Sequence, residues 1–165
     1  MDPAPPVYAA LDALGIAYER YEHPAVFNAG DASAHWAPLG ATQCKNLFLR
    51  NKKGDRHYLV VLEISKRADL RDLVKAVDDD RLSFGSPERL MGKLGLTPGS
   101  VSPFGLLNDA DGSVRVLVDR DLQGCDRLIF HPNINTASVV ISWRDLERFL
   151  ATRANVVGVI SVPRV

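Results

Sequence analysis

Three polar stretches of the sequence carry residue types that can do chemistry. Lys45 stands where an apolar segment begins and offers a positive charge. Gly99–Gly105 (the glycine loop, GSVSPFG) combines two glycines with a proline, and such loops can present unpaired backbone N–H groups to an anion or a carbonyl. His131–Thr136 places polar side chains directly after the apolar run that ends at Phe130, and strand ends often line sites.

Each stretch also has an ordinary structural interpretation. A lone lysine beside an apolar segment can be an edge residue whose stem is buried and whose charge is in water. The glycine loop can be a tight connection, and His-Pro-Asn is good turn chemistry. The residues alone therefore predict a domain with a possible site and leave its chemistry open.

Other catalytic constellations are missing from the sequence. The four histidines, at 23, 35, 57 and 131, fall in different predicted elements and form no helical i, i+4 pair, so we expect no metal site. Cys44 and Cys125 are the only cysteines, and Cys44 fits a small buried residue better than a nucleophile. The sequence has no G-x-S-x-G elbow, phosphate-binding P-loop or G-x-G-x-x-G motif, and we expect no cofactor.

Two basic groups are candidates for contact with nucleic acid. The first occupies i, i+4 and i+8 of a predicted helix; it consists of Arg67, Arg71 and Lys75. Aspartates are interleaved with it, so a solvated, salt-bridged face is the alternative interpretation. The second crowds a predicted hairpin and consists of Arg50, Lys52, Lys53 and Arg56.

Composition limits the class of protein. The chain has 165 residues, of which 46% are hydrophobic and 24% charged, which predicts one globular domain over residues 1–165. Twenty basic residues balance twenty acidic ones, which excludes binding of nucleic acid by bulk charge. Without a long apolar run or a signal-peptide pattern, we expect a cytoplasmic protein with no membrane contact, and a monomer.

Periodicity predicts the elements that must position these residues. Strands and helices alternate irregularly, which indicates an α+β or mixed-sheet domain. The predicted helices are 7–14, 28–36, 70–77, one that begins at Ser86 and stops at Gly95, and one that opens at Ser142. The predicted strands are 16–21, 46–50, 57–62, a half-buried strand at 114–118, 128–130 and 138–141.

The order and spacing of the polar stretches resemble a known family. Lys45, Gly99-x-x-x-Pro103 followed by Phe104-Gly105-Leu106, and His131-Pro132-Asn133 with Thr136 are similar to motifs of the YbaK/prolyl-tRNA-synthetase-insertion editing superfamily of aminoacyl-tRNA deacylases. The resemblance runs from the first predicted helix to the last and includes Arg81–Phe84. It implies a single α+β domain with a mixed, largely antiparallel sheet wrapped by helices.

The resemblance also implies roles for particular residues. Lys45 would hold the terminal phosphate or orient the ester, and Gly99, Ser100 and Pro103 would belong to a catalytic loop whose amides face the ester. His131 would limit the size of the substrate side chain. Asn46, Phe104 and Asn133 would line the substrate site, and the charge pattern adds Arg67, Arg71 and Lys75 as tRNA contacts.

The implied activity is hydrolysis of alanine mischarged onto tRNA(Pro), as in the free-standing ProX branch. The partners would be the tRNA(Pro) acceptor end and, for docking, prolyl-tRNA synthetase. The substrate's terminal 2′-hydroxyl would assist the attacking water, so no metal or cofactor would be needed. Three alternatives stay open: a cysteinyl-tRNA(Pro) deacylase, a non-catalytic module that binds tRNA or a synthetase, and a metal-free esterase or amidase.

Overall fold

The two longest apolar runs form the central hairpin of the fold. In a computed structural model, which describes residues 2–163, β2 (Thr42–Asn51) pairs antiparallel with β3 (His57–Glu63). The turn between them is held by Oδ1 of Asn51, which accepts hydrogen bonds from the amides of residues 54, 55 and 56. Gly54 has a φ of +78°, which favours glycine. The predicted hairpin is confirmed.

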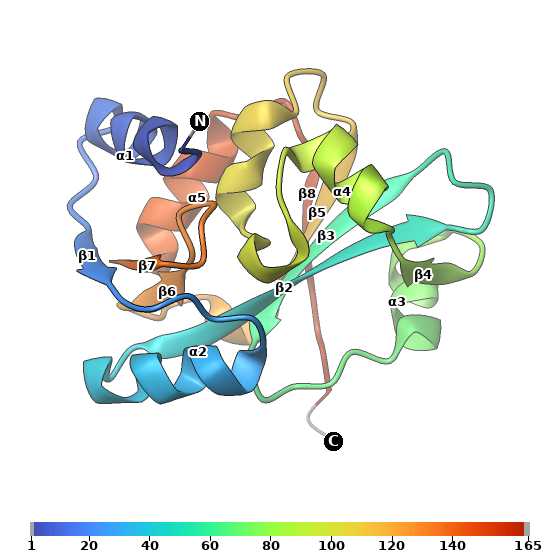
Figure 1. Ribbon diagram of the computed structural model, residues 1–165. Coiled ribbons are helices and arrows are strands. Elements are labelled where there is room, and N and C mark those ends of the chain that lie inside the picture. The colour runs from blue at the N-terminus through green and yellow to red at the C-terminus, as the bar shows by residue number, and fades with distance from the viewer. Residues whose placement is uncertain (1, 164–165) are drawn as a thin grey trace.

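An eight-stranded sheet extends from this hairpin in the order β1-β7-β6-β2-β3-β5-β8, and β4 also pairs with β2 (Figure 1). Four of its strand pairs are antiparallel and three are parallel. The predicted α+β class with a mixed sheet is therefore confirmed. The remaining strands are β1 (Glu19–Glu22), β4 (Leu82–Phe84), β5 (Val114–Asp119), β6 (Leu128–Phe130), β7 (Ala137–Ile141) and β8 (Val157–Ile160).

One edge of β2 is shared by two strands that leave a gap between them. β6 pairs with Thr42 and Gln43, and β4 pairs with residues 49–51. No strand in the described part of the chain pairs with the intervening stretch, residues 44–48, on this edge. Backbone groups alternate between the two edges of a strand, and the carbonyl of Phe48 points to this edge because it accepts from Gly85 at 2.9 Å. Asn46, two residues earlier, therefore turns its backbone N–H and C=O into the gap.

Within residues 2–163, five α-helices surround the sheet: α1 (Ala4–Ala13), α2 (Ala29–Trp36), α3 (Leu70–Val77), α4 (Pro87–Leu94) and α5 (Trp143–Ala151). The caps expected from the sequence are present. Ser86 and Ser142 accept hydrogen bonds from the amides of Arg89 and Asp145, and Gly95 ends α4 with a φ of +65°.

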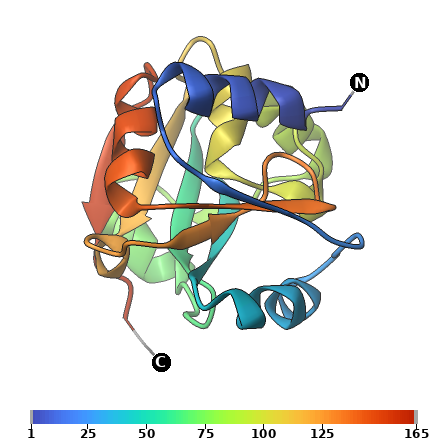
Figure 2. The ribbon, with the colours of Figure 1, turned by 90° about the vertical axis from the view of Figure 1, so that its left-hand side faces the viewer.

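The helices cover the sheet on both faces. Side chains of α1, α4 and α5 join a large core with Cys44, Phe48 and Phe130. α3 packs on the opposite face, where Leu73 and Val77 meet Leu49. Figure 2 shows β1 and β7 side by side between α1 and α2. No helix among residues 2–163 is long and apolar enough to cross a membrane.

Several boundaries differ from the prediction. α3 begins at Leu70, so Arg67 precedes the helix, because the side chain of Asp69 caps it by accepting from the amide of Arg71. The strand expected at 16–21 is β1, at Glu19–Glu22. β5 is not half-buried: Val116 and Leu117 belong to the cores on opposite faces, because β5 lies between β3 and β8.

Candidate active site

A cavity of about 160 Å³ opens beside the gap on β2. Its walls come from β2, the loop before α2, α2 itself, the glycine loop and the start of the segment after β6. The lining residues are Val26, Phe27, Asn28, Ala32, Trp36, Cys44, Lys45, Asn46, Ile64, Pro98, Gly99, Val101 and His131. The structure thus brings together Lys45, Asn46, Gly99 and His131, which lie up to 86 positions apart in the sequence.

Lys45 supplies the positive charge of the cavity. Partial burial lowers the pKa of its ammonium group, the carboxylate of Glu63 raises it, and the guanidinium of Arg67 lowers it. A cation held out of bulk water attracts an anionic ligand more strongly than an exposed one. Lys45 can therefore bind a phosphate or polarise a carbonyl at the cavity wall.

Asn46 contributes a hydrogen-bond acceptor that has no partner. Its Oδ1 atom is buried and receives no hydrogen bond from the described residues. Leaving such an atom unsatisfied costs about 1–3 kcal/mol, so in a folded protein it calls for an explanation. The explanation that fits its place in the cavity wall is a ligand that donates to it.

The glycine loop divides between the cavity and the core. Gly99 and Val101 line the cavity, whereas Ser100, Pro103 and Phe104 are buried behind it. The amide of Ser100 already donates to the carbonyl of Thr97 at 2.9 Å. Of the residues expected in the catalytic loop, Gly99 therefore has direct access to a ligand, and Ser100 and Pro103 do not line the cavity.

Phe104 lies in the core rather than in the cavity. Its ring is fully buried and makes edge contacts with Phe130 and Phe149, at centroid distances of 6.1 and 5.2 Å. Phe104 therefore does not line the cavity.

Asn133 supports the site from behind. Its Oδ1 accepts from Ser102 Oγ at 3.0 Å, and its Nδ2 donates to the carbonyl of Phe104 at 3.2 Å. The residue is buried and has a φ of +64°, a conformation that asparagine tolerates better than most residues. It does not line the cavity, so it is placed to position the glycine loop rather than to touch substrate.

His131 forms part of the cavity wall in its neutral form. Burial lowers the pKa of its imidazole, although a hydrogen bond to the carbonyl of Ala137, at 3.1 Å from Nδ1, opposes this. Because a carbonyl can only accept, the proton is on Nδ1 and Nε2 is left as an acceptor. Its ring also lies 5.2 Å from that of Trp36.

The histidines are closer together than their positions in the sequence suggested. His23 stacks on His35 at 5.3 Å and lies 6.1 Å from His131. His23 is held by Ser138 Oγ, which also accepts from Nε1 of Trp36 at 2.6 Å. Even so, the described residues contain no group of three His, Cys, Asp or Glu side chains arranged to hold a metal ion.

Cys44 lines the cavity but is not set up as a nucleophile. Burial raises the pKa of its thiol far above the usual value, so it stays protonated at neutral pH. Nucleophilic cysteines need the thiolate. The interpretation of Cys44 as a buried structural residue therefore stands.

The three basic residues expected on one helix are separated. Arg67 lies outside α3, close enough to Lys45 to lower its pKa. Arg71 and Lys75 are on α3 and form salt bridges with Asp69 and Asp72 at 3.3 and 3.8 Å. α3 packs on the face of the sheet opposite the core of Cys44, so Arg71 and Lys75 do not border the cavity.

Most of the missed lining residues come from α2 and the loop before it. They include Val26, Phe27, Ala32 and Trp36. None belongs to a motif, and α2 is rich in alanine, so its sequence carries little signal beyond the Asn28 cap. A large aromatic residue such as Trp36 inside an alanine-rich helix is the signal that could have indicated a packed wall.

Comparison with known proteins identifies the family of the chain. Residues 23–149 match the family model described as the aminoacyl-tRNA editing domain. The chain is 41% identical over 155 residues to the prolyl-tRNA editing protein ProX of Acetoanaerobium sticklandii, covering 94% of each chain. It is also 33% identical to the bovine (Bos taurus) prolyl-tRNA synthetase associated domain-containing protein 1, over 85% of this chain and 84% of the relative.

A solved structure supports the fold. The chain superposes with a TM-score of 0.75 on a crystal structure described as a candidate trans-editing enzyme for prolyl-tRNA synthetase. The two share 22% identity, and the match covers 100% of this chain and 99% of the other. Together, the family model and the relatives show that the chain belongs to the aminoacyl-tRNA editing domain family and is an aminoacyl-tRNA deacylase.

Proposed function

We propose that the chain removes alanine that has been mischarged onto tRNA(Pro). A synthetase pocket shaped for proline cannot strongly exclude the smaller alanine, because missing methylene groups are worth only about 1–3 kcal/mol. A second, smaller site can admit alanine and reject proline by size. The small cavity beside Lys45, together with a relative named as a prolyl-tRNA editing protein, supports this assignment.

The observation that carries the proposal is the unsatisfied acceptor of Asn46 beside the charge of Lys45. An aminoacyl ester on a terminal ribose offers donors in its α-ammonium and ribose hydroxyl groups and negative charge in its phosphate. Oδ1 of Asn46 would accept from one of those donors, and Lys45 would attract the phosphate or orient the ester. The backbone groups of Asn46 in the gap on β2 add a donor and an acceptor.

The reaction needs little from the protein beyond position and polarity. Water adds to the ester carbonyl, negative charge develops on its oxygen, and the C–O bond to the ribose breaks to give alanine and a free tRNA hydroxyl. The backbone amides of Gly99 and Val101 are the nearest candidates to stabilise that oxyanion, because both residues line the cavity. The substrate's own vicinal hydroxyl would assist the water, which accords with a protonated Cys44 and a neutral, hydrogen-bonded His131.

Selection by size would come from the inner wall. His131, Trp36, Ala32 and Val26 are bulky or tightly packed groups there, and hydrogen bonds hold His131 and Trp36 in place. A rigid wall can exclude the proline ring, whereas a flexible one would yield. We expect the enzyme to act as a cytoplasmic monomer, alone or docked on prolyl-tRNA synthetase.

The deciding experiment is a deacylation panel. Wild type and Lys45→Ala are tested on the alanyl, cysteinyl, seryl and prolyl esters of tRNA(Pro), on alanyl-tRNA(Ala) and on a free aminoacyl ester. We expect that wild type hydrolyses alanyl-tRNA(Pro) rapidly and that Lys45→Ala does not. Preference for the cysteinyl ester, turnover of the free ester without tRNA, or tight binding with no turnover would each overturn the proposal, in favour of one of the three alternatives.

A further inference from the structure

Two guanidinium groups converge at the turn between β2 and β3. Nη2 of Arg50 and Nη2 of Arg89 lie 2.7 and 2.9 Å from one point, the position that a Cβ atom would occupy on Gly54. Arg50 belongs to β2 and Arg89 to α4. Glycine is therefore needed at this turn for its positive φ and also for the room that both guanidinium groups use.

Hydrogen bonds to the turn hold the two groups in place without using all their donors. Arg50 donates from Nε and Nη2 to two turn carbonyls, each at 3.1 Å. Arg89 donates from Nη1 to the carbonyl of Gly54 and lies 3.0 Å from Nε2 of His57. A guanidinium has five N–H donors, so both side chains keep donors for a ligand and are already ordered.

Arg50, Arg89 and the nearby Lys93 carry positive charges that form no salt bridge with a carboxylate of the described residues. Burial, followed by the charges of Lys93, Arg89 and Arg50, lowers the pKa of His57 to about 4, and Asp109 opposes this only weakly. His57 is therefore neutral at pH 7. Within residues 2–163, no salt bridge joins Arg50, Arg89 or Lys93 to an acidic side chain.

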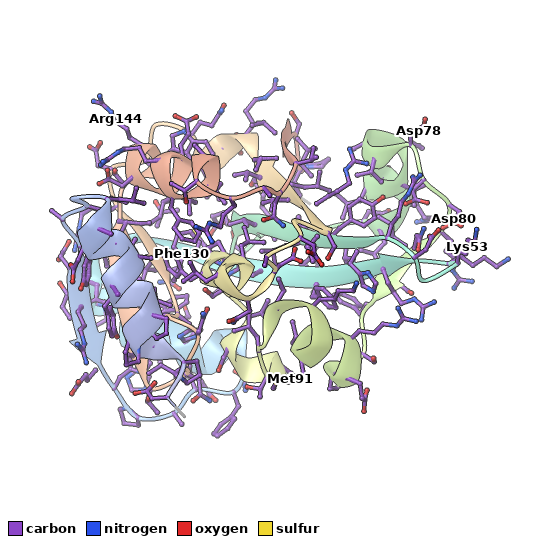
Figure 3. The ribbon with its side chains drawn as sticks, turned by 90° about the horizontal axis from the view of Figure 1, so that it is seen from above. Lys53, Asp78, Asp80, Met91, Phe130 and Arg144 are labelled. Carbon is purple, nitrogen blue, oxygen red and sulfur yellow. The ribbon has the colours of Figure 1, made fainter. Side chains whose placement is uncertain are left out.

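Two other basic residues of the hairpin form salt bridges, whereas Lys52 forms none within residues 2–163. Lys53 pairs with Asp55 at 3.9 Å, and Arg56 pairs with Asp79 at 3.8 Å. Figure 3 shows Lys53 at the end of the molecule that also carries Asp78 and Asp80. We name Arg50, Arg89 and Lys93, the three basic residues whose charges lower the pKa of His57, the Gly54 cluster.

The Gly54 cluster lies on the same side of β2 as Asn46. Side chains alternate along a strand, so Asn46, Phe48 and Arg50 share one side, and Phe48 packs into the core that includes Cys44. Four residues of a strand span about 13 Å. A nucleic acid strand whose 3′ end enters the cavity would therefore reach the cluster within a few nucleotides.

We propose that the Gly54 cluster binds a backbone phosphate of the tRNA acceptor end while the terminal ester occupies the cavity. The proposal builds on the proposed function and adds a second point of attachment. The Nη2 atoms of Arg50 and Arg89 are at most 5.6 Å apart, so one phosphodiester can accept hydrogen bonds from both guanidinium groups. We place the main cationic contact here rather than on α3, because Arg71 and Lys75 form salt bridges with aspartates and lie on the other face of the sheet.

The test measures binding of uncharged tRNA(Pro) at several salt concentrations. For Arg50→Ala with Arg89→Ala we expect about tenfold weaker binding and a slope of log Kd against log salt that is smaller by about 0.7–0.9, the loss of one neutralised phosphate. Arg120→Ala with Arg144→Ala is the matched control, since both arginines are exposed and outside the cluster. Figure 3 shows Arg144 at the opposite end of the molecule from Lys53.

Further variants separate the explanations. Arg50→Lys with Arg89→Lys keeps the charge without the planar donors, so it should bind with intermediate affinity, and thermal unfolding checks that every variant is folded. Unchanged tRNA binding in the alanine double variant would overturn the proposal, as would a loss confined to Arg71→Ala with Lys75→Ala. A third result would also overturn the proposal: inorganic phosphate binds the cluster in an NMR titration, but added phosphate does not change the affinity for tRNA.

The outcome is separable from that of the proposed function. Binding of uncharged tRNA needs no catalysis, so it tests the cluster even if alanyl-tRNA(Pro) is not hydrolysed. If the wild type hydrolyses alanyl-tRNA(Pro) and the alanine double variant matches it in binding, the cluster alone is refuted.

Discussion

Ser102 and Asn133 are joined by a 3.0 Å hydrogen bond from Oγ to Oδ1, which links the glycine loop to the segment after β6. The same asparagine donates to the carbonyl of Phe104, so one buried side chain holds two points of the loop. Gly99 and Val101, at the other end of the loop, line the cavity. The geometry of the proposed oxyanion site therefore depends on a residue that does not line the cavity.

Asn133→Gly should weaken both the fold and the reaction. Glycine accepts the φ of +64° but removes two buried hydrogen bonds, so we expect the free energy of unfolding to fall by about 1–3 kcal/mol. Displacement of the loop should lower kcat more than it raises KM. Urea unfolding and steady-state deacylation check this, and Asn133→Ala should be less stable still because of its positive φ. Normal kcat in a folded Asn133→Gly variant would contradict the positioning role.

Lys45→Ala should reduce deacylation at least a hundredfold with little change in thermal stability, because the lysine is only partly buried.

The pKa of Lys45 also predicts how activity depends on pH. Since burial lowers that pKa, the ammonium form is lost at a lower pH than in ordinary lysine, and activity should fall on the alkaline side. Glu63→Gln removes the group that raises the pKa and should move this fall to lower pH. Glu147→Gln, at an exposed position of α5, should leave it in place, and an opposite or absent shift for Glu63→Gln would refute the assignment.

Asn46→Ala should separate stability from activity. The substitution removes a buried acceptor without a partner, so we expect unchanged or slightly higher stability together with at least a tenfold loss of kcat/KM. Gln43→Ala is the control: its Oε1 is also buried and unsatisfied, but the residue is outside the cavity. A comparable loss of activity in Asn46→Ala and Gln43→Ala would mean that the unpaired Oδ1 atom of Asn46 has no specific role in the reaction.

His131→Ala should relax selection by size. Removing the imidazole enlarges the cavity, so hydrolysis of prolyl-tRNA(Pro) should rise and the alanyl-to-prolyl ratio of kcat/KM should fall by 10-fold or more, as expected for about 1–3 kcal/mol. His35→Ala changes an exposed histidine that does not line the cavity and should keep the wild-type ratio. An unaltered ratio in His131→Ala would place size selection elsewhere in the wall.

His57 should make the fold sensitive to acid. Its folded-state pKa of about 4 lies below the ordinary value, so its contribution to stability is complete above about pH 6.5 and is lost as the pH falls towards 4. The loss is at most about 3 kcal/mol. His57→Gln keeps an acceptor for Arg89 and should flatten this part of the pH profile in chemical denaturation. Equal pH dependence in wild type and His57→Gln would refute the effect.

Local signals in the sequence predicted much of the fold. Ser86 and Gly95 bound α4 because capping depends on residues within one turn, and the hairpin turn at Gly54 is equally local. β5 was misjudged because its burial depends on the parallel neighbours β3 and β8, which alternation within one strand does not reveal. The three-residue β4 and the terminal β8 were missed because their pairing is with distant segments.

The site was only partly predictable for the same reason. Lys45, Gly99 and His131 carry distinctive residue types, and the resemblance to a family picked them out. Phe104 and Pro103 share their motif but are buried, because the short 3-10 helix Pro103–Asn108 that they begin packs into the core. The convergence of Arg50 and Arg89 depends on the packing of α4 against the hairpin, which no spacing in the sequence encodes.

The interrupted ladder on β2 also bears on how such an enzyme can diverge. Every residue except proline supplies the same main-chain N–H and C=O at position 46, so other substitutions leave both groups in place. The surrounding side chains, from α2 to His131, are free to be replaced. In the proposed function, the main-chain groups of Asn46 bind what all aminoacyl esters share, whereas the side chains of the cavity wall select among amino acids. New substrate preferences can therefore evolve by changes in the wall alone.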